Sequence, residues 1–257
     1  MDANRVPIHG SSTCVGRPAR STGATIFRWP RASSSVDPVT GDGQRCILLR
    51  RPPVLSVIDE PFVPEGIDPV EVDDRWHRLQ QANPALFDGR VLHVLGVHRN
   101  GHGGVTIHLA ESSYRYVAVQ DAQFDCGVRT LGVKGLVRHG GKVLLGRRAS
   151  WVHHYPGEWE FAPAGGVEPG RDPAQVILDE LKEETGCSPA GAPIARAMLL
   201  DDASWSWEVV YEIQAEGEGL EPGTDEYSDL IWTDPGTLPS PLSPIAERMR
   251  VLLRPSE

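Results

Sequence analysis

The sequence predicts a mixed α/β fold in which a larger α/β domain follows a smaller α/β unit. Apolar strands that flank glycine-rich turns occur in both parts of the chain, and each part also carries a segment with apolar residues at helical spacing. No internal repeat is visible. We therefore expect a segment without regular structure over 1–55, a small α/β domain over 56–126 and the larger domain over 127–257.

The composition restricts the class of protein. The 257 residues are 40% hydrophobic, which is enough for real cores. The formal net charge of −10 argues against a general binder of nucleic acid or of a membrane surface. No apolar run approaches the roughly 20 residues that span a bilayer. These features predict a cytoplasmic protein and leave its oligomeric state open. Its four scattered cysteines are interpreted as reduced thiols: Cys14, Cys46, Cys126 and Cys187.

The N-terminal segment differs from the rest in composition. The stretch "RPARSTGATIFRWPRASSSVDPVTGDG" is rich in Arg, Ser, Gly and Pro, is nearly free of acids and lacks sustained periodicity. A transit peptide has a similar composition. We favour an unstructured tail or an overlong start of the reading frame.

The smaller unit is expected to begin with a helix and continue as a hairpin. In "VEVDDRWHRLQQANPALF", Val72, Trp76 and Leu79 recur at helical spacing before Asn83-Pro84 ends the helix. The stretch "GRVLHVLGVHRNGHGGVTIHLA" then holds two β-rich runs around a glycine-rich turn. "SSYRYVAVQ" is predicted as a strand or a short helix, and "DAQFDCG" as the link to the larger domain.

The larger domain opens with two strands, "TLGVKGLVRHGGKVLLGRR", around a Gly140-Gly141 turn. Lys142 is followed by Val143 in place of Ser or Thr, so we reject a phosphate loop here. "SWEVVYEIQ" alternates as in a half-buried strand, "DLIWTDPGTLP" supplies another short strand, and "PIAERMRVLLR" predicts a closing amphipathic helix.

Between these strands lies an acidic helix. Asp172 is placed to cap it, Pro173 suits the first helical position, Gln175 completes a capping-box pattern, and Gly186 ends the helix. A helical wheel gives it a buried apolar face of Ala174, Ile177, Leu178 and Leu181. The wheel also places three carboxylates on one side, which are Glu180, Glu183 and Glu184. By itself such a pattern is typical of a solvated acidic surface.

The turn before the helix adds a second feature. Gly165-Gly166 and the following Glu168-Pro169-Gly170 let the backbone fold tightly against the helix and direct a carbonyl to the same place. Clustered carboxylates together with a carbonyl suit a hard cation such as Mg²⁺.

At this point the chain resembles the Nudix hydrolases. Their signature is Gly, five residues, Glu, seven residues, then Arg-Glu-aliphatic-any-Glu-Glu-any-Gly-aliphatic, and the spacing is kept here from Gly165 to Cys187. The resemblance implies an α/β/α sandwich with a mixed sheet. It also implies a Mg²⁺-dependent enzyme, with Mn²⁺ as an alternative, that cleaves a nucleoside diphosphate linked to another group. The implied metal ligands are Glu180, Glu183, Glu184 and the carbonyl of Gly165.

The chain departs from the signature at three positions. Arg171 stands where the family has Glu, Asp179 stands where it has Arg, and Cys187 takes the last aliphatic position. In the family the first two residues form an ion pair between loop and helix. Acid and base have exchanged places here, so we predict a reversed pair and an intact site.

Further site residues follow from the same resemblance. A general base is expected at Glu183 or at an acid before a later strand, where "GTDEYSDLIW" offers Asp225 and Glu226. Arg147 and Arg148 are candidates for contact with phosphate oxygens. His153 and His154 are assigned to a loop surface.

The smaller unit resembles the front domain of the Nudix subgroup that includes the animal UDP-glucose pyrophosphatase. The likeness rests on Trp76, Asn83, Pro84, Phe87, Asp88, Gly89 and Tyr114. It implies that UDP-glucose or UDP-galactose is cleaved to UMP and a sugar 1-phosphate. The alternatives are ADP-ribose or another nucleoside diphosphate derivative, suggested by "EFAPAGGVEPG", and a non-catalytic Nudix-fold sensor of nucleotide sugars.

Overall fold

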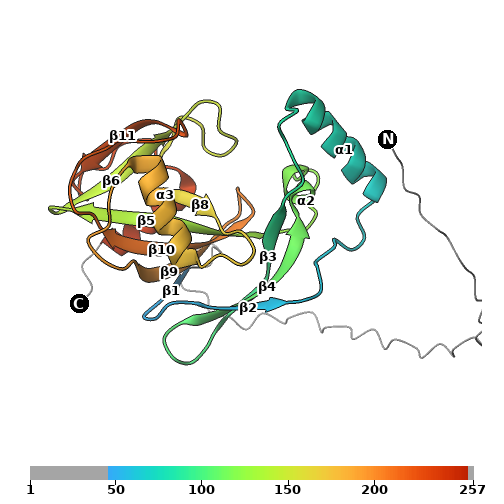
Figure 1. The fold of residues 1–257 in the computed structure, drawn as a ribbon, viewed down its shortest axis with the longest axis horizontal. Coiled ribbons are helices and arrows are strands. Elements are labelled where there is room, and N and C mark those ends of the chain that lie inside the picture. Colours follow the sequence, from blue (N-terminus) through green and yellow to red (C-terminus); the bar gives the residue numbers. More distant parts are fainter. Residues whose placement is uncertain (1–45, 254–257) are drawn as a thin grey trace, which may run out of the picture. The chain divides into compact units, whose positions relative to one another are not determined.

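Eleven strands form one hydrogen-bonded sheet in the computed structural model, which describes residues 46–253 (Figure 1). The strands are β1 (Cys46–Leu48), β2 (Val54–Ile58), β3 (Arg90–Arg99), β4 (Val105–Ser113), β5 (Thr130–His139), β6 (Lys142–Arg148), β7 (Trp159–Phe161), β8 (Ala164–Gly166), β9 (Ile194–Asp201), β10 (Ser206–Gln214) and β11 (Tyr227–Thr233). The order along the main path is β1-β9-β10-β5-β3-β4-β2. Off this path, β6 pairs with β5, β7 and β11, and β8 pairs with β5. The sheet is mixed, because β5–β10 and β2–β4 are parallel pairs. The predicted α/β class is confirmed.

Four α-helices accompany the sheet in the described part of the chain. They are α1 (Pro69–Ala82), α2 (Tyr114–Ala118), α3 (Pro173–Glu180) and α4 (Pro244–Met249). Two of them continue in another helical form, namely α3 as the π-helix η1 (Leu181–Thr185) and α4 as the 3₁₀-helix η2 (Arg250–Leu253). No helix within residues 46–253 is long and apolar enough to cross a membrane.

The smaller unit has the predicted helix and hairpin. The carboxylate of Asp68 accepts a hydrogen bond from the Val70 N–H at 2.9 Å and begins α1, and the Asn83 N–H donates to the Leu79 carbonyl where the helix ends. Strands β3 and β4 pair in antiparallel fashion, as expected for a hairpin. The segment "SSYRYVAVQ" completes β4 and then forms the short helix α2.

The sheet passes from the smaller unit into the larger one. His93 of β3 pairs with Thr130 of β5, and the Val94 N–H donates to the Arg129 carbonyl at 2.8 Å. Backbone hydrogen bonds therefore join residues on both sides of the predicted boundary at 126/127, which remains a prediction.

Regular structure begins before residue 56, where we expected none. β1 pairs with β9 through Ile47 and Met198, and β2 pairs with β4. The expectation is therefore wrong for residues 46–55. Strands β9 and β4 offer unpaired backbone groups at two edges of the sheet, and the Pro-rich sequence does not prevent β1 and β2 from pairing with them. The other residues of that segment, 1–45, lie outside the described part of the chain.

The turn between β5 and β6 has the predicted form. Gly140 and Gly141 have φ angles of 56° and 85°, and His139 pairs with Lys142 across them. Two successive residues with positive φ are what a two-residue hairpin turn requires, and glycine adopts them without a Cβ clash.

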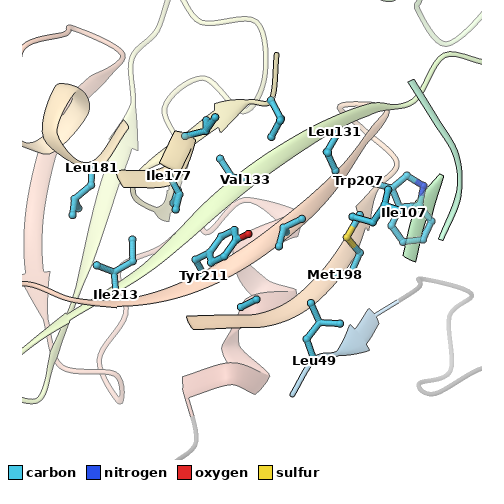
Figure 2. Close-up of a cluster of buried hydrophobic side chains, with 14 of the residues drawn as sticks. Leu49, Ile107, Leu131, Val133, Ile177, Leu181, Met198, Trp207, Tyr211 and Ile213 are labelled. Carbon is cyan, nitrogen blue, oxygen red and sulfur yellow. The ribbon is translucent and has the colours of Figure 1, made fainter. Parts of the chain in front are cut away.

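Alternate residues of β5 and β10 belong to two different cores. One core lies under α3, where Ile177 and Leu181 pack with Val133 and Tyr211 (Figure 2). The other core contains the opposite-facing Leu136 of β5 and residues of α4. The central strands are thereby held from both faces, and the residues at their ends line the site described next.

Candidate active site

The acidic helix begins as its sequence predicts. The Asp172 carboxylate accepts from the Ala174 N–H at 3.1 Å, and Pro173 occupies the first helical position. Gln175 does not complete a capping box, because its side-chain amide donates to Asp179 at 2.8 Å. It therefore supports the loop-to-helix contact described below.

The last turn of this helix departs from the α-helical wheel. The π-helix η1 runs from Leu181 to Thr185, and Gly186 ends it with φ of 75°. A π turn has more residues per turn than an α turn, so the residues after Glu180 do not follow the predicted spacing. Glu180 is partly buried, Glu183 is exposed and Glu184 is only 2% exposed. The three glutamates therefore differ in burial, and their shared face and metal-binding role remain predictions.

Glu180 lies against the glycine turn. A Cβ placed on Gly165 would lie 2.3 Å from the Glu180 Oε1, so only glycine allows this approach. Gly165 is held in β8, where it pairs with Val133 of β5. Burial, followed by the negative charges of Glu183 and Glu226, raises the pKa of Glu180 to about 7.

Glu184 is the more deeply buried carboxylate. Its Oε2 accepts a hydrogen bond from the Ala164 N–H at 3.0 Å. Burial raises its pKa to about 8, although the Ala164 hydrogen bond opposes this shift. Among the ion pairs of the described residues, none includes Glu180 or Glu184. Two carboxylates thus lie against Ala164 and Gly165 of β8 without an ion-pair partner.

These two carboxylates fit a divalent cation in their chemistry. Oxygen donors with raised pKa values are stabilised in the charged form by a bound metal ion. In residues 46–253, however, no three His, Cys, Asp or Glu side chains are gathered closely enough to hold a metal ion as they stand.

The exchanged pair of charges is brought together. The Arg171 guanidinium Nη2 and the Asp179 Oδ2 form an ion pair between the loop and α3, and both side chains are largely exposed, at 44% and 42%. The Arg171 N–H also donates to the Glu168 carbonyl at 3.1 Å. The loop that carries Gly165-Gly166 is therefore tied to the helix that carries Glu180.

A cavity of about 770 Å³ opens beside Glu180. Its walls come from both units: Phe87 and Tyr114 from the smaller one, and Gly165, Glu180 and Arg148 from the larger one. The size is sufficient for a nucleotide derivative.

Of the two arginines predicted as candidates for contact with phosphate, Arg148 lines this cavity. Its Nε lies 3.4 Å from the Glu160 Oε1, and its Nη1 lies 3.2 Å from the Glu226 Oε2. The neighbouring Arg147 is exposed, donates to the Gly157 carbonyl at 3.1 Å and does not line the cavity. Successive strand residues point to opposite faces, so only one of two adjacent arginines can line the cavity.

The candidate bases lie in different places. Glu226 lines the cavity together with Glu180, whereas Asp225 is exposed. Glu183 lines a smaller cavity of about 230 Å³ that it shares with Arg171 and Asp179. His154, assigned to the loop surface, lines the large cavity, and burial lowers its pKa, whereas His153 is exposed.

Sequence reasoning missed a group of buried polar residues in the same cavity. They lie in β5, β7, β9 and β10, and they are Lys134, Glu160, Asp201, Ser206 and Glu208. The Lys134 Nζ donates to the Glu160 Oε2 at 3.0 Å. A signal was present, because Lys134 and Glu208 are charged residues within the apolar runs of two central strands.

Comparison with protein families supports this description. Residues 128–254 match the family model described as NUDIX domain. A curated relative, isopentenyl-diphosphate Delta-isomerase of Corynebacterium diphtheriae, is 28% identical over 109 residues, which cover 38% of this chain and 59% of the relative. The chain therefore spans about three fifths of that relative's length.

Solved structures are also similar to the described fold. The MutT NUDIX hydrolase from Burkholderia pseudomallei is 21% identical, with 48% of this chain and 94% of that chain covered and a TM-score of 0.40. The NUDIX domain of NrtR from Shewanella oneidensis, complexed with ADP ribose, is 23% identical over 53% of this chain and 92% of that one, with a TM-score of 0.39. The family match and the sequence signature together identify residues 128–254 as a Nudix domain.

Proposed function

We propose that this protein is a divalent-metal-dependent hydrolase that cleaves the diphosphate of a nucleoside diphosphate sugar of the UDP-glucose or UDP-galactose type. The products would be a nucleoside monophosphate and a sugar 1-phosphate. The observation that carries the proposal is a pair of carboxylates with raised pKa values and no ion-pair partner, the partly buried Glu180, which lines a nucleotide-sized cavity, and the buried Glu184.

The glutamates and the glycine turn would hold the metal, which is Mg²⁺ or, as an alternative, Mn²⁺. Glu180, Glu183 and Glu184 are the proposed ligands, together with the Gly165 carbonyl. When bound, the metal neutralises phosphate charge and lowers the pKa of a water molecule. It would also relieve the repulsion between the acidic cavity and a diphosphate.

The chain's own residues would position the diphosphate and the water. Arg148 lines the cavity and offers guanidinium N–H groups to phosphate oxygens, while Glu160 and Glu226 keep its side chain oriented. We propose Glu226 as the general base, because it lines the same cavity as Glu180. Glu183 is the alternative base. Attack of water on one phosphorus breaks the bridging P–O bond.

The smaller unit supports the choice of substrate class. Several residues of the resemblance to the UDP-glucose pyrophosphatase subgroup line the cavity, and these are Asn83, Phe87, Gly89 and Tyr114. An aromatic ring at such a wall suits a nucleobase. ADP-ribose contains the same chemical groups and remains the alternative substrate.

A second candidate is isomerisation of isopentenyl diphosphate, which the name of the curated relative favours. Its apolar five-carbon chain has no hydroxyl group to donate to the remaining acceptor oxygens of Asp201 and Glu208, which line the cavity. We therefore expect no isomerised product from that diphosphate.

Hydrolysis of UDP-glucose, UDP-galactose, ADP-ribose, nucleoside triphosphates and isopentenyl diphosphate with Mg²⁺ tests the proposal, with products separated by chromatography. We expect UMP and sugar 1-phosphate from the UDP-sugars. Glu180→Gln and Glu184→Gln should each reduce turnover at least 100-fold. Glu247→Gln is a matched control, since that exposed glutamate pairs with Arg250 outside the cavity. Near wild-type rates in either glutamine variant would contradict the ligand assignment.

A further inference from the structure

Part of the cavity lining is formed by polar residues on a single face of three adjacent strands. Ser206 pairs with Asp201 of β9 and with Thr130 of β5, and Glu208 pairs with Gly132. Residues two apart in a strand share a face, so these side chains lie together. The same face continues into the apolar core under α4, where Leu136 and Val210 pack. We name the group formed by Thr130, Gly132, Lys134, Asp201, Ser206 and Glu208 the polar floor.

The polar floor is buried although it carries charges. Asp201, Ser206, Glu208 and Lys134 are between 3% and 7% exposed. Burying charged groups costs free energy, and apolar residues at these positions would extend the neighbouring core. Lys134 compensates part of this charge, but its ammonium group is already bound to Glu160 at 3.0 Å. The stability of the fold therefore does not explain why these charged residues are buried.

The floor has acceptor capacity that the described residues do not fill. The Asp201 Oδ1 accepts from the Tyr155 hydroxyl at 2.6 Å, whereas its buried Oδ2 has no hydrogen-bond partner. Glu208 accepts from the Ser206 hydroxyl at 2.5 Å through its Oε1. Gly132 makes room for the second oxygen, because a Cβ there would lie 2.4 Å from the Glu208 Oε2. Asp201 and Glu208 both line the cavity, so a ligand there would lie beside carboxylates that accept hydrogen bonds.

The charge of the cavity indicates which kind of ligand group would donate hydrogen bonds to the polar floor. Six carboxylate residues line it, against three lysine and arginine residues. An additional phosphate would be repelled at the floor, whereas uncharged hydroxyl groups would fill the free acceptor positions. Phe87, on the wall from the smaller unit, is 75% exposed and offers a face to a base. The remaining part of such a ligand, the sugar ring that carries hydroxyl groups, is therefore expected to lie at the polar floor.

We propose that the polar floor is the binding site for the sugar ring of a nucleoside diphosphate sugar, with Asp201 and Glu208 accepting hydrogen bonds from its hydroxyl groups. This inference rests on the proposed function, since it names the part of the same ligand that the floor would hold. It makes the floor the element that distinguishes a diphosphate sugar from a nucleoside triphosphate.

Calorimetric titration in Ca²⁺ measures this contact without relying on turnover, with the ligand recovered afterwards to confirm that it is intact. The probes are two matched pairs, UDP-glucose with UDP and ADP-ribose with ADP. Glu208→Gln and Asp201→Asn should raise the Kd of a diphosphate sugar about tenfold and change the Kd of the matching nucleoside diphosphate less than twofold. Ser206→Ala is a milder variant that should raise the sugar Kd about threefold.

The matched control is Glu212→Gln, because Glu212 lies on the same face of β10, pairs with Arg138 and Arg196 and does not line the cavity. It should leave all four Kd values unchanged. Equal losses for sugar and diphosphate in the floor variants, or no loss in either pair, would overturn the proposal. If wild-type binding follows the expected pattern but Mg²⁺ supports no hydrolysis, then the proposed function fails and the sugar site stands.

Discussion

At the scale of one residue, Glu184 is a proposed metal ligand whose burial is expected to lower the stability of the fold. A carboxylate that is 2% exposed and lacks a cationic partner is costly to bury in its charged form. We expect Glu184→Gln to raise the melting temperature in EDTA by several degrees, since the amide keeps an acceptor for the Ala164 N–H. Differential scanning calorimetry measures this, and a lower melting temperature would show that Glu184 stabilises the fold.

The Arg171–Asp179 pair makes a second prediction at the same scale. Because both side chains are largely exposed, their interaction should contribute about 0.2 to 1 kcal/mol. Arg171→Glu or Asp179→Arg alone should lower stability and turnover, and the double exchange should recover most of the loss. A double-mutant cycle measures the coupling. Strictly additive effects would show that the pair does not hold the loop to the helix.

His93 predicts a pH dependence of stability. Its imidazole is 5% exposed, stacks on Phe62 at 3.9 Å and accepts the Arg129 N–H at Nδ1. Burial, followed by the charge of Arg129, lowers its pKa to about 4. The unfolded chain therefore binds this proton near pH 6.5 and the folded chain only near pH 4, so stability is lost as the pH falls through that window.

The size of this loss should approach about 3 kcal/mol for the full window. His93→Asn keeps an acceptor for the Arg129 N–H and should flatten the decline between pH 6.5 and 4 in urea unfolding. His98→Asn, at an exposed histidine of the same strand, should leave the decline as in the wild type. A wild-type slope in His93→Asn would assign the acid sensitivity to other groups.

At the scale of elements, the cavity wall from the smaller unit should set substrate affinity. Phe87 is exposed and lines the cavity, so Phe87→Ala removes a stacking face with little effect on packing. We expect KM for the nucleoside diphosphate sugar to rise about tenfold while kcat changes less than twofold. Steady-state kinetics on Val63→Ala, at an exposed residue outside the cavity, provides the control. A change in kcat alone would assign Phe87 another role.

Strands and helices with clear local sequence signals could be predicted from the sequence, whereas short strands and the π turn could not. The Gly140-Gly141 hairpin and the Asp172-Pro173 helix start follow from local backbone preferences, which a sequence displays directly. The short strands β7 and β8 form because β5 and β6 offer partners far along the chain. The π turn after Glu180 is likewise a departure from the regular α-helical wheel that the sequence predicts.

The polar floor could not be predicted from the sequence for a related reason. Lys134, Asp201 and Glu208 are far apart in sequence, and only the pairing of β5, β9 and β10 brings them to one face. The glutamate-rich signature, by contrast, lies within two dozen consecutive residues, so a resemblance finds it at once. Long-range strand pairing therefore separates the predictable part of the site from the rest.

At the scale of the whole molecule, charge opposes the proposed ligand. The net charge is −10, and carboxylates outnumber cationic residues around the cavity. A nucleoside diphosphate sugar approaching this surface is repelled over a distance that shrinks from about 30 Å at 0.01 M salt to about 10 Å at 0.1 M. Added NaCl should therefore raise kcat/KM about twofold between these concentrations at saturating Mg²⁺.

The control for this effect is the metal concentration, since saturating Mg²⁺ prevents salt from acting through metal binding. A neutral osmolyte at equal osmolality should leave kcat/KM unchanged, because it does not screen charge. Arg90 and Arg148 are the two cavity-lining arginines that would produce the opposite result by attracting phosphate locally, whereas the third cation, Lys134, is bound to Glu160. A fall of kcat/KM with salt would mean that these two arginines outweigh the acidic surface, and Arg148→Gln should then abolish the salt dependence.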